Sequence, residues 1–436
     1  SAHCIDTDSS DAMGARGTGM AMIFSSNAQE AYDLSIIAHL ASLKTKIPFL
    51  HIYPSENGSY EIRDVCYITD NKLKDLIDES AFRAFRANGL SSENSAVFGT
   101  VQDSSTYFQS REALNRYYSA LSEILQRELD KFAKVTGRQY NAFDYIGSKE
   151  ASKLIIIMGQ GSDTVSDTVE YLNKKGEKTA VIKVRLYRPF NAKALMNIIP
   201  KTVRFITVLD NTKEAGSSGE ALYKDVCTAI EESGRRFNAV LGGRYGIGGK
   251  SFTNAAVASI FDNMTGKCLN HFTIGITDDV EKLSLPIDKN FNLSNKNTTE
   301  TLFFGTAAQL SISPKQLTAA IEQLRKENQA DCEVSAYSKA FLSQFGSPTL
   351  LTIRSGEDVN NKQYLSTNPD FVVCAQCRYS KIYDVLQGAR ENAVFLLNTQ
   401  YASDDVWNHL PIEVQKHIIE KKMKFYVRSE ERRVGK

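Results

Sequence analysis

Residue types that bind ligands follow three short apolar runs in the middle of the chain. The runs are Leu154–Met158, Ala180–Val184 and Phe205–Leu209. In an open parallel sheet, ligands usually bind at the edge where the carboxyl ends of the strands meet. We therefore expect one sheet edge to carry the residues at or just after these ends: Gly159, Gly161, Ser162, Arg185, Arg188, Asp210, Lys213 and Glu214.

The glycines Gly159 and Gly161 allow two interpretations. A Gly-Gln-Gly turn before a helix can present backbone N–H groups to a phosphate. The same glycines can instead serve only to make a tight strand-to-helix turn, and neither a GxGxxG nor a GxxxxGK[ST] motif is present. The glycine cluster Gly242–Gly249 has the same two interpretations, a close approach of ligand to backbone or a tight loop.

The elements that position these residues follow from the hydrophobic pattern. Continuous apolar runs are typical of parallel strands buried on both faces. Between the first two runs, Asp163–Asn173 places Val165, Val169 and Leu172 on one helical face, and Gly176 ends the helix. Further helices are predicted at Ala28–Leu43, about 112–135, 253–264 and 314–326, and further strands at 47–53, 302–305, 349–353, 371–374, 393–397 and 424–427. The segment 99–118 is interpreted as a polar connection.

The positions of the cysteines and histidines in the sequence predict no catalytic site and no metal site. Cys374 and Cys377 form a lone C-x-x-C, whereas tetrahedral zinc and iron–sulfur clusters take four ligands. The six histidines are isolated, so no Ser/His/Asp triad is predicted. Seven scattered cysteines favour a reducing compartment, and we expect a cytoplasmic protein. We nominate no catalytic residue and no metal ligand.

Composition indicates a multidomain protein. The chain has 436 residues and a formal net charge of +1, with basic and acidic residues interspersed. No basic, aromatic-interleaved patch favours nucleic acid, and no window of 18 apolar residues predicts a membrane span. A linker rich in Asn, Ser and Thr is predicted at 289–300.

Six long strings carry a family resemblance: GRQYNAFDYIG (137–147), VIKVRLYRPF (181–190), VLDNTKEAGSSGEALYKDV (208–226), GGRYGIGGKSFTNA (242–255), NHFTIGITDDV (270–280) and HLPIEVQKHIIEKKMKFYV (409–427). In this collinear order they resemble pyruvate:ferredoxin oxidoreductases. The resemblance implies an α/β fold of several three-layer domains with mostly parallel sheets. It divides the chain into the end of a thiamine-diphosphate-type domain (1–138), a transketolase C-terminal-like domain (139–288) and a domain similar to the coenzyme A-binding domain (296–427). Residues 428–436 resemble a translated sequencing adapter, and we expect a non-native tail there.

The resemblance also implies a substrate site near the N-terminus. The arginine that contacts substrate in this family lies in an Arg-x-Thr-Gly string, matched here by Arg16-Gly17-Thr18-Gly19. A guanidinium fork suits a carboxylate because it donates two parallel charge-assisted hydrogen bonds. Arg16 and Thr18 are therefore the implied contacts of a pyruvate carboxylate. A loop arginine paired with Asp8 or Asp11 is the alternative.

Two loops depart from the family pattern. Tyr53–Glu61 lacks the arginine and histidine that family members carry there, and Gly305–Pro314 lacks the glycines of the coenzyme A loop. Both losses favour a relative that kept the scaffold without the decarboxylation, and the region around Phe304 resembles the flavoprotein subunit of fungal assimilatory NADPH-sulfite reductase.

We therefore interpret the chain as a fragment, inactive alone, from the scaffold of such a sulfite reductase, with FAD, FMN and NADPH bound by domains elsewhere. A divergent pyruvate:ferredoxin or pyruvate:NADP oxidoreductase, with thiamine diphosphate, Mg²⁺, iron–sulfur clusters and coenzyme A, is one alternative. A non-catalytic oligomerisation module is another. The expected partners are other domains and subunits of the same enzyme, in an oligomer, with no nucleic acid and no membrane. No cofactor is assigned to residues of this chain.

Overall fold

The chain divides into two compact units in a computed structural model. The larger unit comprises residues 7–55 and 65–291, and the smaller comprises 1–6, 56–64 and 292–436. The structure describes residues 4, 8–53, 61–62, 65–92, 95, 99, 101–277, 279–288, 291, 293, 298–306, 323, 333–340, 346–356 and 364–429. No helix in these described ranges is long and apolar enough to cross a membrane.

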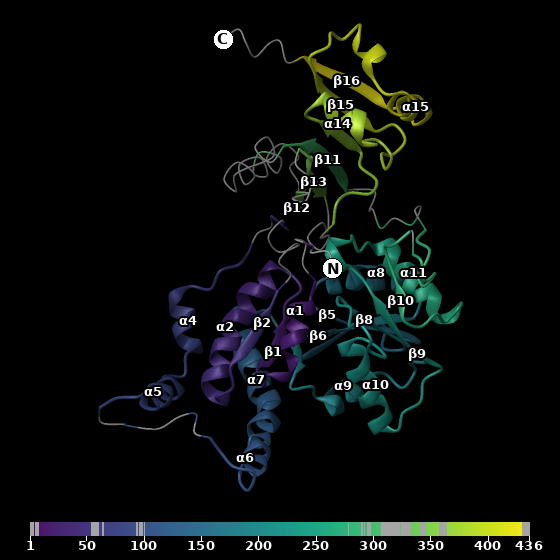
Figure 1. The fold of residues 1–436 in the computed structure, drawn as a ribbon. Helices are drawn as coiled ribbons and strands as arrows, with labels where there is room; N and C mark the ends of the chain where they lie inside the picture. Colours follow the sequence, from purple (N-terminus) through teal and green to yellow (C-terminus); the bar gives the residue numbers. More distant parts are fainter. Residues whose placement is uncertain are drawn as a thin grey trace. The chain divides into compact units, whose positions relative to one another are not determined.

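A six-stranded sheet forms the centre of the larger unit, with strand order β10-β9-β8-β5-β6-β4 (Figure 1). Its strands are parallel except for the edge strand β4, which is antiparallel to β6. The three predicted central strands are confirmed. The strands are β4 (Phe143–Gly147), β5 (Lys153–Met158), β6 (Thr179–Val184), β8 (Phe205–Asp210), β9 (Ala239–Arg244) and β10 (Phe272–Thr273).

Helices cover both faces of this sheet because alternate side chains of each strand point to opposite faces. Ile155 and Ile157 pack with α8 (Ser162–Lys174) and α11 (Asn254–Thr265). Leu154 and Ile156 pack on the other face with α9 (Ala192–Ile198) and α10 (Ala221–Ser233). The chain thus leaves β5 toward one face and leaves its neighbour β8 toward the other. Their carboxyl ends therefore form a topological switch point, where open α/β sheets usually bind ligands.

A second sheet of the larger unit joins the N-terminal region to the middle region. Its order is β2-β1-β7, with β1 (Ala21–Phe24) parallel to β2 (Phe49–Ile52) and antiparallel to β7 (Leu186–Arg188). The long helices α2 (Ala28–Thr45) and α7 (Asn115–Thr136) pack on it through a fully buried cluster that includes Ile23, Leu34, Ile37, Leu121, Leu125 and Leu129. The two regions therefore share one sheet across the predicted boundary at residue 138.

The remaining elements of the larger unit are short helices. They are α1 (Ser10–Gly14), η1 (Ala15–Gly17), α4 (Asp70–Leu76), α5 (Glu79–Ala87), α6 (Tyr107–Ala113) and η2 (Ile247–Gly249). The segment 99–118, interpreted as a polar connection, instead contains α6 and the first turn of α7. None of the side chains of α6 is buried, so it carries no apolar stripe, which is why the hydrophobic pattern did not reveal this helix.

The smaller unit has a seven-stranded sheet of order β16-β15-β14-β11-β13-β12-β3. The first four strands are parallel, whereas β13, β12 and β3 are antiparallel to their neighbours. The elements are β3 (Glu61–Ile62), β11 (Thr299–Gly305), β12 (Glu333–Ala340), β13 (Thr349–Gly356), β14 (Phe371–Cys374), α14 (Cys377–Ile382), β15 (Val394–Thr399), η3 (Val406–His409), α15 (Ile412–Glu420) and β16 (Lys424–Ser429).

The smaller unit departs from the predictions in its strands β3 and β12, neither of which was predicted, and at its C-terminal end. Arg428 and Ser429, assigned to the expected tail, form the end of β16 and pair with β15. Apart from residues 305, 306 and 323, the predicted helix 314–326 and the loop Gly305–Pro314 lie outside the described residues, as do residues 54–60 of the loop Tyr53–Glu61.

Candidate functional site

A cleft of about 380 Å³ opens at the switch point of the six-stranded sheet. Residues after β5 and β8 meet there with residues from the ends of β1 and β2 and from the segment before β1. The lining residues are Asp8, Ser9, Asp11, Ala12, Ala15, Phe24, Ser25, Leu50, His51, Ile52, Tyr53, Gly159, Gln160 and Asn211. The cleft therefore combines the N-terminal and middle regions of one compact unit.

Hydrogen bonds hold the first wall of the cleft against the end of β8. The backbone N–H of Ser9 donates to the carbonyl oxygen of Asn211 over 2.8 Å. The hydroxyl oxygens of Ser10 and Thr212 lie 3.0 Å apart. The amide nitrogen of Asn211 donates to the carbonyl oxygen of Tyr245 over 2.9 Å, which fixes the end of β8 to the end of β9. The position of Asp8 and Asp11 in the cleft thus depends on the middle region.

Steric contacts explain the two glycines after β5. Gly159 has φ +63°, and a Cβ there would lie 3.2 Å from the Phe24 ring. Gly161 has φ +85° at the N-cap of α8, and a Cβ there would lie 2.8 Å from Tyr245 and 2.9 Å from Phe252. Both conformations favour glycine. The glycines let the ends of β5, β1 and β9 approach closely, so the tight-turn interpretation accounts for them.

We expect Gly161→Ala to destabilise the larger unit by about 2–3 kcal/mol, from left-handed strain and from overlap with the rings of Tyr245 and Phe252. Gly176→Ala is the matched control, because Gly176 has φ +91° and a Cβ added there would have no atom within 4 Å. It should cost only about 1 kcal/mol of strain. Denaturant unfolding of both variants measures the difference, and equal costs would show that ring contact is unimportant.

His51 and Ser25 form a polar pair inside the cleft. His51 lies in β2 and Ser25 follows β1, and the Nε2 and Oγ atoms are 2.6 Å apart. Burial, and to a lesser extent the charge of His39, lowers the pKa of His51 to about 4. The imidazole is therefore neutral at physiological pH and offers one donor and one acceptor. The sequence alone assigned His51 no role, because its only signal is its place in a strand at this edge.

The depressed pKa of His51 makes stability depend on pH. The folded protein binds this proton less readily than the unfolded chain, whose histidine has a pKa of about 6.5. The contribution is therefore complete above pH 6.5 and is lost as the pH falls toward 4, with a loss of about 2 kcal/mol at pH 5. We expect His51→Asn to lose this part of the pH dependence. Unfolding free energies of both proteins at pH 7.5 and pH 5 provide the check, and parallel losses would contradict it.

Asp210 and Arg188, two other charged residues of the predicted sheet edge, are engaged in structural contacts. Asp210 accepts hydrogen bonds from the backbone N–H groups of Leu222 (2.9 Å) and Tyr223 (3.1 Å), so it anchors the first turn of α10. Burial raises the pKa of Asp210 to about 7. Arg188 pairs with Asp225 at 2.9 Å, outside the residues that line the cleft.

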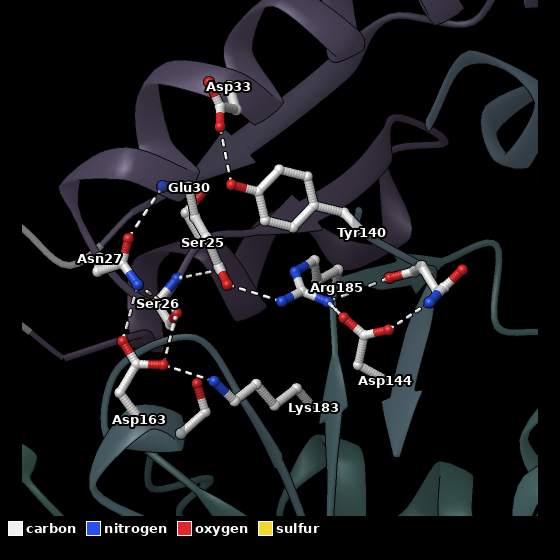
Figure 2. A network of polar contacts seen from close by, with 12 residues as sticks. Ser25, Ser26, Asn27, Glu30, Asp33, Tyr140, Asp144, Asp163, Lys183 and Arg185 are labelled. Carbon is white, nitrogen blue, oxygen red and sulfur yellow. Dashed lines mark hydrogen bonds and ion pairs between the residues drawn. The ribbon is translucent and has the colours of Figure 1, made fainter. Parts of the chain in front are cut away.

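Arg185 belongs to a buried polar network that fixes the loop after β1 (Figure 2). Its guanidinium pairs with Glu30 of α2 at 2.7 Å and with Asp144 of β4. Although burial opposes the charge, these two carboxylates raise the pKa of Arg185 above its usual value. An arginine predicted at a ligand-binding edge therefore connects α2 to the middle region.

The second part of the network centres on Asp163 at the start of α8. Asp163 accepts from Lys183 of β6 at 2.5 Å, from the Asn27 amide at 2.8 Å and from the Ser26 hydroxyl at 3.2 Å. Figure 2 shows Ser26, Asn27 and Lys183 all directed at the carboxylate of Asp163. Ser26 and Asn27 directly follow the cleft residue Ser25, so the network sets the position of this cleft wall.

The structure places Arg16 and Thr18 beside the cleft rather than among its lining residues. Arg16 follows the lining residue Ala15, and its guanidinium pairs with Glu214 at 2.8 Å and donates to the carbonyl oxygen of Met13 at 2.7 Å. The partner is thus Glu214, not Asp8 or Asp11. The Thr18 hydroxyl donates to the carbonyl oxygen of Ala15 at 2.7 Å.

The cleft does not fit the diphosphate of thiamine diphosphate, the cofactor that the resemblance implies. Its charged lining residues are the carboxylates Asp8 and Asp11, and no lysine or arginine lines it. In the described part of the chain no cluster of His, Cys, Asp and Glu is able to hold a metal ion. A diphosphate with its metal needs cations or ligands that this cleft does not supply.

The C-x-x-C pair lies in the smaller unit. Cys374 ends β14 and is buried, and burial raises the pKa of its thiol to about 12. Cys377 begins α14 and lines a separate cleft of about 360 Å³ with Arg378, Lys381 and Tyr401. A thiol that stays protonated at neutral pH is a poor nucleophile and a poor metal ligand.

Two family models match the chain. Residues 1–129 match the model described as pyruvate flavodoxin/ferredoxin oxidoreductase, thiamine diP-bdg, and residues 151–257 match pyruvate:ferredoxin oxidoreductase core domain II. A solved structure, 2-oxoglutarate:ferredoxin oxidoreductase from Magnetococcus marinus, aligns with a TM-score of 0.35 and 13% identity over 59% of this chain and 45% of that chain.

Curated relatives match almost the whole chain. The pyruvate-flavodoxin oxidoreductase of Trichormus variabilis is 40% identical and the pyruvate:ferredoxin oxidoreductase of Moorella thermoacetica 38% identical, each over 96% of this chain and 35% of the relative. The NADP⁺ pyruvate dehydrogenase of Euglena gracilis is 33% identical over 95% of this chain and 23% of the relative.

These similarities do not support the sulfite reductase interpretation, nor the FAD, FMN and NADPH that came with it; they favour the pyruvate alternative. The error arose from giving two altered loops more weight than long collinear strings. The chain belongs to the pyruvate:ferredoxin oxidoreductase superfamily and spans about a third of the length of the curated pyruvate-flavodoxin and pyruvate:ferredoxin relatives that it matches.

Proposed function

We propose that this chain is part of a 2-oxoacid oxidoreductase that oxidatively decarboxylates pyruvate and passes the electrons to ferredoxin or flavodoxin. The observation that carries the proposal is the collinear similarity to pyruvate oxidoreductases over 96% of the chain. The position of the cleft at the switch point of the middle sheet agrees with it.

In this proposal the complete polypeptide, about three times as long, supplies what the cleft lacks. Thiamine diphosphate, when bound, would allow the carboxylate of the 2-oxoacid to leave as CO₂ from the neighbouring carbonyl carbon. Its diphosphate and metal, and the iron–sulfur clusters, would be held by parts of the enzyme outside this chain. The present residues would bind and orient the 2-oxoacid and complete one wall of the site.

Arg16 is the proposed contact for the substrate carboxylate. A guanidinium has five N–H groups, and the contacts to Glu214 and Met13 occupy only part of this capacity. The remaining N–H groups are able to donate to a carboxylate, which accepts a fork of two bonds. Thr18 would join this contact only after its hydroxyl turned away from the carbonyl oxygen of Ala15, because a carboxylate needs a donor.

The test uses the complete enzyme, purified without oxygen. We expect pyruvate to reduce a low-potential viologen dye in a thiamine-dependent reaction, and we expect no sulfite reduction. Sulfite reduction without pyruvate oxidation would overturn the proposal. Assays with and without coenzyme A decide whether the altered loop Gly305–Pro314 still permits its use as the acyl acceptor.

Substrate contact is tested by variants of Arg16. Arg16→Lys keeps the charge and loses the fork, so the KM for pyruvate should rise roughly tenfold, and Arg16→Ala should raise it further. Arg83→Ala is the matched control, because Arg83 lies on the exposed surface of α5 with a loose 3.8 Å pair to Glu79. An unchanged KM for pyruvate in Arg16→Ala would remove Arg16 from the site.

A further inference from the structure

A chain of three charged side chains runs from Arg16 into the middle region. Arg16 pairs with Oε1 of Glu214 at 2.8 Å, and Lys224 pairs with Oε2 of the same carboxylate at 2.5 Å. Lys224 also donates to the hydroxyl of Ser217 over 2.8 Å. The Glu214 carboxylate therefore lies between two cations from different parts of the sequence.

The environment keeps Glu214 ionised and in place. Its side chain is 16% exposed, compared with 34% for Arg16. Partial burial opposes the charge, but the hydrogen bond from Lys224 and the charges of Arg16 and Lys224 hold the pKa of Glu214 below its usual value. The charge-assisted hydrogen bond from Lys224 is short and directional, and Arg16 adds an ion pair at 2.8 Å. Together they restrict this largely buried carboxylate more than a fully exposed pair would.

The turn that carries Glu214 is fixed at both ends. At its start, Asn211 accepts from Ser9 and donates to Tyr245. At its end, the chain enters α10, the helix that carries Lys224, and the first turn of this helix is anchored by hydrogen bonds to Asp210. Arg16 has a long side chain with several rotatable bonds, and its second contact is a single backbone oxygen, that of Met13. Glu214 is thus the rigid point to which the guanidinium is attached.

We infer that Glu214 is a positioning residue, which holds the guanidinium of Arg16 in the orientation that receives the carboxylate of the 2-oxoacid. The inference rests on the proposed function. Without Glu214, the arginine must lose its rotamer freedom each time substrate binds, and this cost appears as weaker binding. The effect falls on the KM for the 2-oxoacid and spares the later electron transfer to the acceptor.

The charge of Glu214 also has an effect on substrate binding that opposes positioning, and two variants distinguish the two effects. The negative charge of Glu214 also repels a substrate carboxylate, so its removal strengthens binding if repulsion dominates. Glu214→Ala removes both the charge and the attachment point. Glu214→Gln removes the charge but keeps an oxygen beside the guanidinium of Arg16 and a side chain of the same size. If positioning dominates, the alanine variant is impaired and the glutamine variant lies between it and the native enzyme.

The experiment measures KM for pyruvate, kcat, KM for the electron acceptor and the unfolding temperature of the complete enzyme. For Glu214→Ala we expect KM for pyruvate to rise about tenfold, with kcat within about threefold and acceptor KM unchanged. For Glu214→Gln the KM for pyruvate should rise about threefold. Glu231→Ala is the control, because Glu231 pairs with Arg236 on the exposed surface of α10. It should change none of these values.

The inference is overturned if Glu214→Ala leaves the KM for pyruvate unchanged or lowers it, or if KM for the acceptor rises equally. If Arg16→Ala leaves the KM for pyruvate unchanged, the proposed carboxylate contact of Arg16 is wrong. If Arg16→Ala raises this KM but Glu214→Ala does not, only the role of Glu214 is wrong. If Glu214→Ala does not fold, the KM for pyruvate is measured in Glu214→Gln and Lys224→Met instead. Lys224→Met serves because it removes the cation that holds the other oxygen of the Glu214 carboxylate. Unchanged KM for pyruvate in both refutes the inference.

Discussion

Lys183→Met is expected to destabilise the larger unit by about 3–5 kcal/mol. Lys183 is 9% exposed, and its ammonium group lies 2.5 Å from Asp163, which also accepts from Ser26 and Asn27. Although burial opposes its charge, the nearby carboxylates Asp163 and Glu30 raise the pKa of Lys183. Methionine fills similar space but leaves the buried Asp163 carboxylate without its cation, and that uncompensated charge causes the loss.

The control for this prediction is Lys178→Met. Lys178 pairs with Glu150 at 2.7 Å, a similar distance, but both side chains are more than half exposed. Exposed pairs contribute about 1 kcal/mol or less. Denaturant unfolding monitored by circular dichroism compares the two variants. Equal losses would mean that burial of the Lys183–Asp163 pair does not determine its strength.

Arg354→Met is expected to cost the smaller unit about 3–5 kcal/mol. Arg354 of β13 is fully buried and lies directly across from Glu300 of β11, with Nε and Oε1 3.2 Å apart. Its guanidinium also donates to the carbonyl oxygen of Tyr364 at 2.7 Å. The substitution removes the cation opposite Glu300 and leaves the Tyr364 oxygen without this donor.

Arg390→Met is the matched control in the same unit. Arg390 pairs with Asp370 at 2.7 Å, but both side chains are about 30% exposed. We expect a loss of about 1 kcal/mol. Thermal or denaturant unfolding, followed with a probe in the smaller unit such as Trp407, measures both variants. A loss below about 1 kcal/mol for Arg354→Met would contradict the prediction.

Much of the fold was predictable because burial leaves a clear pattern. The run Leu154–Met158 predicted β5 because a strand covered on both faces is apolar at every position. The strand Glu333–Ala340 was missed because small and polar residues occupy most of its positions, and it is held by pairing with β13 and β3. Propensity alone does not reveal such a strand.

The candidate site was less predictable because it depends on contacts between distant residues. The switch point exists because the chain crosses from β6 over β5 to β8, and hydrophobic periodicity does not reveal strand order. Arg185 was expected at a ligand edge, but its partner Glu30 lies 155 positions earlier. His51 was missed because its pairing with Ser25 appears only once β1 and β2 are aligned.

The sheet β2-β1-β7 sets an order of events during synthesis. β1 is complete after residue 24, but the strand that pairs with its second edge, β7, begins only at residue 186. Until then the nascent chain carries an unpaired strand edge, which is a template for aggregation. A polypeptide that stops near residue 138 retains this edge permanently. We therefore expect the N-terminal region to mature only together with the middle region, and to aggregate when produced alone.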